Sequence, residues 1–141
     1  MTAERKICTF YVHNFFFGID VFKIQEVIRF QEMTHVPLAS DVISGLINMR
    51  GQIVTAIDMR KRLDFPPAEE KPTNIIVRTD DSLISLLVDG IGDVIDIPED
   101  KFESPPENVK SSFQQFLKEV CQLDKQLLLI LDIEQLLKIA M

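Results

Sequence analysis

The stretch "LINMRGQIVTAIDMRKRL", residues 46–63, determines how the whole chain is interpreted, because a related stretch follows later. Moved forward by 74 places, from position 46 to position 120, it falls on "VCQLDKQLLLILDIEQLL", residues 120–137. Each copy contains an apolar run, a polar pair and a second apolar run. An aspartate follows the second run, and after it comes a short segment of mixed polar and apolar residues. The pattern predicts the same unit twice: a β-hairpin followed by one helical turn.

The polar pair of each copy predicts the hairpin turn, and the aspartate predicts the start of the helix. Gly51, which follows Arg50, supplies the positive φ that a tight turn needs. Asp58 and Asp132 occupy matching positions. Because a carboxylate before a helical turn accepts hydrogen bonds from the first free backbone N–H groups, both are interpreted as helix caps.

A looser internal match supports a duplicated all-β fold. Residues 17–28, "FGIDVFKIQEVI", resemble residues 86–97, "LLVDGIGDVIDI": a strand ends at an aspartate, and a short break precedes a second strand. Short apolar segments separated by turn signals recur along the chain, which is typical of a barrel or sandwich with few, short helices. We therefore expect residues 1–141 to form a single domain of two intertwined half-barrels that pack on a shared core.

Connections between the expected strands follow from local composition. Asp20 is expected to cap a single helical turn ahead of a strand over residues 27–30. Residues 94–112 are expected to begin as a strand and to become a long polar loop. The remaining turns and irregular stretches are marked by Asn, Asp, Ser and Pro; they are His13-Asn14, residues 64–73 and residues 80–82.

Composition excludes several classes of function. The net charge of −7 would repel a phosphate backbone, so nucleic acid is not an expected partner. The widely separated Cys8 and Cys121 are typical of buried thiols in a reducing compartment. The N-terminal residues lack a secretory pattern, and the longest apolar run, residues 127–131, is far shorter than a membrane span. A cytoplasmic protein without membrane insertion is expected.

The sequence offers no persuasive catalytic, cofactor or metal site. One aspartate in each repeat invites comparison with the aspartic proteases, but Asp58 and Asp132 lack the small hydroxyl residue and the glycine that should follow them. A duplicated β-barrel hydrolase that uses this pair is retained only as an alternative from a different class. His13 and His35 are interpreted as surface residues, and the basic run 60–62 as a solvated helix face.

The hairpin motif and its surroundings resemble the CheW family of chemotaxis coupling proteins. The resemblance rests on "NMRG", residues 48–51, and "DMR", residues 58–60, and it extends through residues 17–28, 86–97 and 127–137. It implies a mainly β fold of two SH3-like five-stranded β-barrels around a common hydrophobic core, with a few short helices. It also implies no catalysis and no cofactor, because stand-alone members act as adaptors.

The resemblance further implies partners and site residues. The expected partners are the regulatory domain of a CheA-type histidine kinase and the cytoplasmic tip of a methyl-accepting chemoreceptor, at membrane arrays. Self-association in rings is left open by the sequence. By motif position, Ile24, Glu26, Gly45 and Arg50 are the expected partner-binding residues. Arg50 pairs either with a partner carboxylate or internally with Glu26, and Gly45 is also explained by backbone geometry alone. Service in another chemosensory pathway, such as twitching motility on surfaces, is the alternative within the family.

Overall fold

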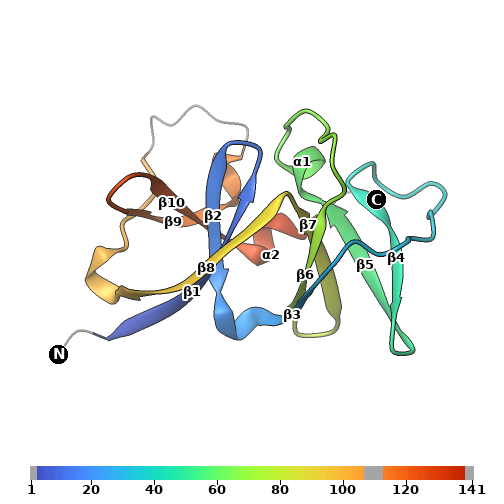
Figure 1. Ribbon diagram of the computed structural model, residues 1–141, viewed down its shortest axis with the longest axis horizontal. Helices are drawn as coiled ribbons and strands as arrows, with labels where there is room; N and C mark the ends of the chain where they lie inside the picture. Colours follow the sequence, from blue (N-terminus) through green and yellow to red (C-terminus); the bar gives the residue numbers. More distant parts are fainter. Residues whose placement is uncertain (1–2, 107–112, 139–141) are drawn as a thin grey trace.

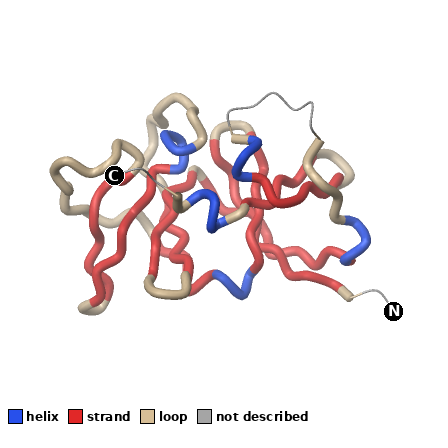
Figure 2. Tube along the Cα trace, turned by 180° about the vertical axis from the view of Figure 1, so that it is seen from behind, coloured by secondary structure: helices blue, strands red, loops and turns tan. Residues whose placement is uncertain are grey.

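A computed structural model describes residues 3–106 and 113–138, and it shows a mainly β protein. Two five-stranded sheets lie side by side along the long axis of the molecule, with short helical turns between strands (Figures 1 and 2). Barrel A has the strand order β8-β1-β2-β10-β9, and barrel B has the order β3-β6-β7-β5-β4. The expected pair of SH3-like barrels is confirmed.

The elements are short throughout. The strands are β1 Glu4–Val12, β2 Phe15–Asp20, β3 Ile24–Ile28, β4 Ile43–Met49, β5 Gln52–Asp58, β6 Thr73–Arg78, β7 Leu83–Val88, β8 Gly90–Pro98, β9 Leu117–Gln122 and β10 Leu127–Leu131. The helical turns are η1 Val21–Lys23, α1 Met59–Arg62, η2 Glu99–Lys101, η3 Gln114–Phe116 and α2 Ile133–Leu136.

The chain consists of two repeats of five strands each, β1–β5 and β6–β10, and the two repeats exchange strands. After β2 of barrel A, the chain passes through η1 into β3 of barrel B, and after β7 of barrel B it passes into β8 of barrel A. Each barrel therefore combines two strands of one repeat with three strands of the other. In both barrels a parallel pair joins these parts, β10 with β2 and β5 with β7.

The repeated hairpin–helix unit is confirmed in detail. The β4–β5 hairpin leads into α1 and the β9–β10 hairpin into α2, in the same order and orientation within their sheets. The Asp58 carboxylate accepts a hydrogen bond from the Lys61 N–H at 3.2 Å, and the Asp132 carboxylate accepts one from the Gln135 N–H at 3.2 Å. Both aspartates thus act as helix caps, as predicted.

Each barrel is closed by an equivalent backbone bridge between its outermost strands. Thr34, beyond β3, exchanges two backbone hydrogen bonds with Leu46 of β4, and Glu103, beyond β8, does the same with Val120 of β9. Leu46 and Val120 are matched by the same shift that relates the two hairpins. The bridges satisfy backbone groups that an open sheet edge would leave free for another chain.

One apolar core runs through both barrels and holds them together, as expected. It includes Phe10 and Phe17 from barrel A, and Ile75 and Leu86 from barrel B, all fully buried. The buried side chains of both helical turns close it from α1 and α2; they are Met59, Ile133 and Leu136. Burial of this apolar surface is the main favourable contribution to folding.

Both cysteines are buried free thiols, as the sequence indicates. Cys8 is 4% exposed and Cys121 is 1% exposed. Desolvation by burial raises the pKa of each thiol above its ordinary value. Because the thiolate is the reactive form, burial and the raised pKa both lower the reactivity of these thiols in the folded protein.

Local details correct three expectations. Asp20 caps η1 through the Phe22 N–H, but this turn ends at Lys23, so β3 spans Ile24–Ile28 and the strand expected over residues 27–30 is misplaced. The hairpin turn at His13-Asn14 is present, with its positive φ of 59° at His13. The second correction concerns the histidines, because His35 is exposed as expected whereas His13 is half-buried. The expected loop over residues 107–112 lies outside the described residues.

The third correction concerns the basic run of α1, where only Lys61 is a solvated residue. The Arg60 side chain is 18% exposed, and its guanidinium donates to both carboxylate oxygens of Asp89, at distances from 2.7 to 3.1 Å. Arg62 donates to the backbone oxygens of Leu136 at 2.8 Å and of Lys138 at 2.7 Å. Spacing along the sequence cannot reveal these partners, which lie 29 to 76 positions away.

Asp89 lies at the point where the chain leaves barrel B for barrel A. Besides Arg60, its carboxylate accepts the backbone N–H of His13 at 2.6 Å, and its own N–H donates to the Tyr11 oxygen at 2.9 Å. Burial acts to raise the pKa of the Asp89 carboxyl, but the hydrogen bonds from Arg60 and His13 outweigh it, and the pKa lies below its ordinary value.

Substitution of Gly45 tests how closely the segment after β3 packs against β4. A Cβ atom at this position would lie 2.8 Å from the Met33 Cβ and 2.8 Å from the Thr34 backbone oxygen. We expect Gly45→Ala to lower the free energy of unfolding by about 1–3 kcal/mol, because the bridging segment must move. Gly90→Ala is the control, since a Cβ there meets no atom within 4 Å. Urea denaturation that shows equal losses for the two variants would contradict this explanation.

The lowered pKa of Asp89 predicts a dependence of stability on pH. A carboxyl whose pKa is lower in the folded state stabilises the fold at pH values above its unfolded pKa of about 4. This stabilisation disappears as the pH falls through the folded pKa. We therefore expect Asp89→Asn to reduce the free energy of unfolding at neutral pH, and the difference from the unmodified protein to shrink on acidification.

Denaturant titrations between about pH 7 and about pH 3 measure this difference. Asp81→Asn, in the exposed β6–β7 turn, is the control for removing a negative charge. A difference for Asp89→Asn that stays constant across this range would show that the variant acts through packing alone.

Candidate functional site

The candidate site is built on the tip of the β4–β5 hairpin. Met49 and Gln52 form the last strand pair, and Arg50 and Gly51 connect them with φ values of 52° and 85°. Positive φ at both central residues matches the twist of tight hairpin turns, so the predicted role of Gly51 is confirmed. The Asn48 side-chain oxygen accepts the Gly51 N–H at 3.0 Å and fixes the turn from one side.

Arg50 pairs with Glu26 through two parallel hydrogen bonds. Its Nη1 and Nη2 atoms donate to the two carboxylate oxygens at 2.8 and 3.0 Å. The internal pair, which the sequence left as one of two arrangements, is therefore formed. The hydrogen bonds to Glu26 raise the pKa of Arg50, so the guanidinium stays charged at any physiological pH.

The two members of the pair differ in exposure. The Arg50 side chain is 76% exposed, whereas the Glu26 side chain is 25% exposed. Glu26 belongs to β3 and Arg50 to the tip beyond β4, and these two strands are the outermost of barrel B. The ion pair thus ties the free end of the hairpin to the opposite edge of its sheet, with the cation facing solvent.

Ile24 and Gly45 occupy different environments from the ion pair. The register of β3 against β6 shifts between Ile24 and Glu26, so these two residues do not share a face of the strand. Ile24 pairs with Val77 and packs half-buried against the shared core. Gly45 is buried within β4 beneath residues 33–34. The structure therefore brings Glu26 and Arg50 together, places Ile24 against the shared core, and separates Gly45 from the exposed surface.

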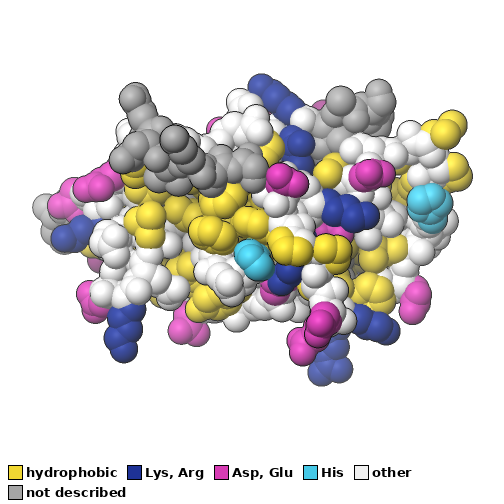
Figure 3. Space-filling model, turned by 90° about the horizontal axis from the view of Figure 1, so that it is seen from above, with side chains coloured by type: hydrophobic (Ala, Val, Ile, Leu, Met, Phe, Trp, Pro, Cys, Tyr) yellow, Lys and Arg dark blue, Asp and Glu magenta, His cyan; other side chains and the backbone are white. Residues whose placement is uncertain are grey.

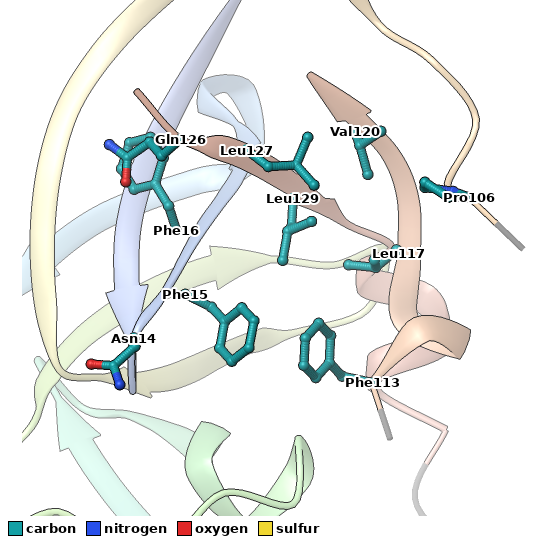
Figure 4. Close-up of a pocket in the computed structure, with 10 residues that line it drawn as sticks. All are labelled: Asn14, Phe15, Phe16, Pro106, Phe113, Leu117, Val120, Gln126, Leu127 and Leu129. Carbon is teal, nitrogen blue, oxygen red and sulfur yellow. The ribbon is translucent and has the colours of Figure 1, made fainter. Parts of the chain in front are cut away.

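Sequence reasoning missed an apolar pocket of about 240 Å³ on barrel A (Figure 4). Ten residues line it: Asn14, Phe15, Phe16, Pro106, Phe113, Leu117, Val120, Gln126, Leu127 and Leu129. Figure 3 shows that hydrophobic side chains gather on the molecular face seen from above. The available signal was the run of three phenylalanines at residues 15–17, because successive side chains of a strand cannot all face one core.

Neither a metal centre nor a membrane span is found in the part of the chain that the structure describes. Over residues 3–106 and 113–138, acidic, histidine and cysteine side chains form no cluster that could hold a metal ion. No helix in these ranges is both long and apolar enough to cross a bilayer. Asp58 and Asp132 each cap their own helix, and this accounts for the carboxylates of the hydrolase alternative.

Comparison with known proteins identifies the family. The model of the CheW-like domain matches residues 6–141. Chemotaxis protein CheW of Bacillus subtilis is 33% identical over 138 residues, covering 94% of this chain and 88% of the relative. Chemotaxis protein CheW of Thermotoga maritima is 30% identical over 136 residues, covering 96% of this chain and 89% of the relative.

A solved structure agrees with these relatives. The crystal structure of scaffolding protein TtCheW from Thermoanaerobacter tengcongensis superposes with a TM-score of 0.88 at 28% sequence identity, covering 99% of this chain and 94% of that one. Proteins of this family are non-catalytic scaffold adaptors, so the hydrolase alternative is wrong. Motifs, fold and relatives agree that the chain belongs to the CheW-like family of chemotaxis scaffold proteins.

Proposed function

We propose that this protein couples the cytoplasmic tips of chemoreceptors to the regulatory domain of a CheA-type histidine kinase, within receptor arrays at the cytoplasmic face of the membrane. The names of the relatives support a role in chemotaxis. The observation that carries the residue-level part of the proposal is the exposed, doubly hydrogen-bonded pair of Arg50 and Glu26.

The pair is suited to binding because it holds a long side chain in one position before a partner arrives. A free arginine loses considerable rotamer freedom when it becomes ordered at an interface. Here two hydrogen bonds to Glu26 already restrict Arg50. A guanidinium carries five N–H donors, so those that Glu26 does not use remain available to a carboxylate or carbonyl of a partner.

Apolar surface beside the hairpin tip complements this charge. Ile53 follows the tip by two residues and is 58% exposed. Interfaces combine buried apolar anchors with charged groups that set orientation. We assign partner contact to Arg50 and Glu26, and we assign to Ile24 and Gly45 the shaping of the strands beneath them.

The architecture also suits an adaptor with more than one partner. Two barrels of equivalent topology form the ends of one elongated molecule (Figure 1). We propose that residues 1–141 act as a single domain whose two ends engage different neighbours, and that copies of the chain associate in rings on the same principle.

Replacement of Arg50 tests the proposal. We expect Arg50→Ala to keep the native fold, because this side chain is exposed, and to weaken capture of the receptor fragment or the kinase regulatory domain by at least about fivefold. Affinity is measured with both purified partners from the same cell. Glu26→Ala is expected to weaken the same partner, since it releases the arginine.

Lys6→Ala provides a matched control on barrel A. Lys6 forms an exposed ion pair with Asp96 at 3.0 Å, between the neighbouring strands β1 and β8. Lys6→Ala therefore measures how the loss of a surface ion pair outside the candidate site affects binding of the partners. Equal binding by the unmodified protein and Arg50→Ala would leave Arg50 as an ordinary turn residue, and failure to bind either partner would refute the coupling role.

A further inference from the structure

The helical turn α1 sends two arginines in different directions from the shared core. Met59 and Leu63 are fully buried in that core, and Arg60 and Arg62 leave the turn between them. Arg60 contacts the crossover between the barrels, whereas Arg62 contacts α2, the matching turn of the other repeat. A turn of four residues thus contacts both repeats on two sides.

On the first side, Arg60 and Asp89 join three segments. The Arg60 guanidinium bonds the Asp89 carboxylate, and its Nη1 donates to the Pro66 oxygen at 2.7 Å. Asp89 in turn accepts the His13 N–H from the β1–β2 turn of barrel A. The crossover, the β1–β2 turn and the stretch after α1 are therefore connected through one carboxylate and one guanidinium.

On the second side, Arg62 binds the carboxyl end of α2. Its guanidinium donates to the backbone oxygens of Leu136, Lys138 and, at 3.3 Å, Gln135. It also lies 4.5 Å from the ring centre of Phe116, in the turn that precedes β9. The last carbonyls of a helix lack partners within it, and a cation is favoured there.

The internal repeat shows that these arginines are not needed to build the hairpin–helix unit. The shift of 74 places that aligns the repeats pairs Arg60 with Glu134 and Arg62 with Leu136. The second unit nevertheless forms the same hairpin, the same aspartate cap and the same helical turn. The arginines are therefore not required for the hairpin–helix fold, and apart from the bond from Arg60 to Pro66 their hydrogen bonds reach the other repeat.

We propose that Arg60 and Arg62 are positioning residues that fix the orientation of barrel A relative to barrel B. The apolar core resists separation of the barrels, but apolar attraction has no direction. Hydrogen bonds to a charged group are directional, and they hold α1 from two sides. The functional part rests on the proposed adaptor role: a fixed orientation aligns the surfaces that the two ends present to different partners.

Distance measurements between the barrels test the orientation without any partner. Spin labels are attached at Asp81→Cys, in the β6–β7 turn of barrel B, and at Asp124→Cys, in the β9–β10 turn of barrel A. Both sites are exposed, whereas Cys8 and Cys121 are buried and protected from the label. Pulsed electron paramagnetic resonance then gives the distribution of distances between the two labels.

The test compares a double variant with a control on the same helical turn. We expect the labelled protein and its Lys61→Gln control, which changes the exposed middle residue of the basic run, to share one narrow distribution. The double variant Arg60→Gln and Arg62→Gln is expected to give a broader or displaced distribution of distances between the labels. Its circular dichroism spectrum is expected to show that the β structure is retained. Asp89→Asn should reproduce part of the change.

Two results would overturn the inference. One is an unchanged narrow distribution in the folded double variant and in Asp89→Asn. The other is complete unfolding of both, because the contacts would then serve stability rather than orientation. Capture of both partners at once adds the functional readout: the double variant is expected to bind each partner singly and to lose the ternary complex. If the unmodified protein binds neither partner while the double variant shows altered distances, the adaptor role is refuted and the positioning role stands. If the double variant shows altered distances and still forms the ternary complex, the functional part of the inference is refuted.

Discussion

The structure depends on the incompleteness of each repeat. Neither repeat forms a barrel by itself, because its third and fifth strands pair with the first two strands of the other repeat. The apolar faces of these strands can be buried only when both repeats are present, and the result is a core shared by the two barrels together with a smaller apolar cluster within each barrel. Helical caps, turns and closing bridges refine this arrangement, but the exchanged strands determine which surfaces meet.

Much of the fold could be predicted from the sequence because its signals are local. The match between residues 46–63 and 120–137 predicted two hairpins and two capped turns, since polar pairs, apolar runs and aspartates act on their immediate neighbours. The strand exchange could not be obtained this way. Whether β3 pairs with β2 or crosses to β6 depends on packing, and a sequence pattern does not state which strand accepts a partner.

The candidate site shows the same division. The role of Gly51 could be predicted, because the tight turn itself requires a positive φ, and the positive charge of Arg50 follows from its residue type. The bond from Arg50 to Glu26 spans 24 positions and joins opposite edges of a sheet, so the sequence left it as one of two possibilities. Arg60 and Arg62 were misinterpreted for a related reason: a basic run on a short helix normally faces solvent, and only the tertiary structure supplies Asp89 and the end of α2.

The strand exchange is asymmetric along the chain, and this has a consequence for biosynthesis. All strands of barrel B lie between Ile24 and Val88, whereas barrel A needs β1 and β2 together with strands that end at Leu131. Barrel B is an insertion within barrel A. On the ribosome its strands are complete while the β1–β2 hairpin, with Phe10 and Phe17 on its apolar face, still lacks β8 and β10. The β1–β2 hairpin is synthesised before all the other strands but completes its own sheet only after barrel B, and during that interval its apolar face depends on the newly formed barrel B or on chaperones for protection from aggregation.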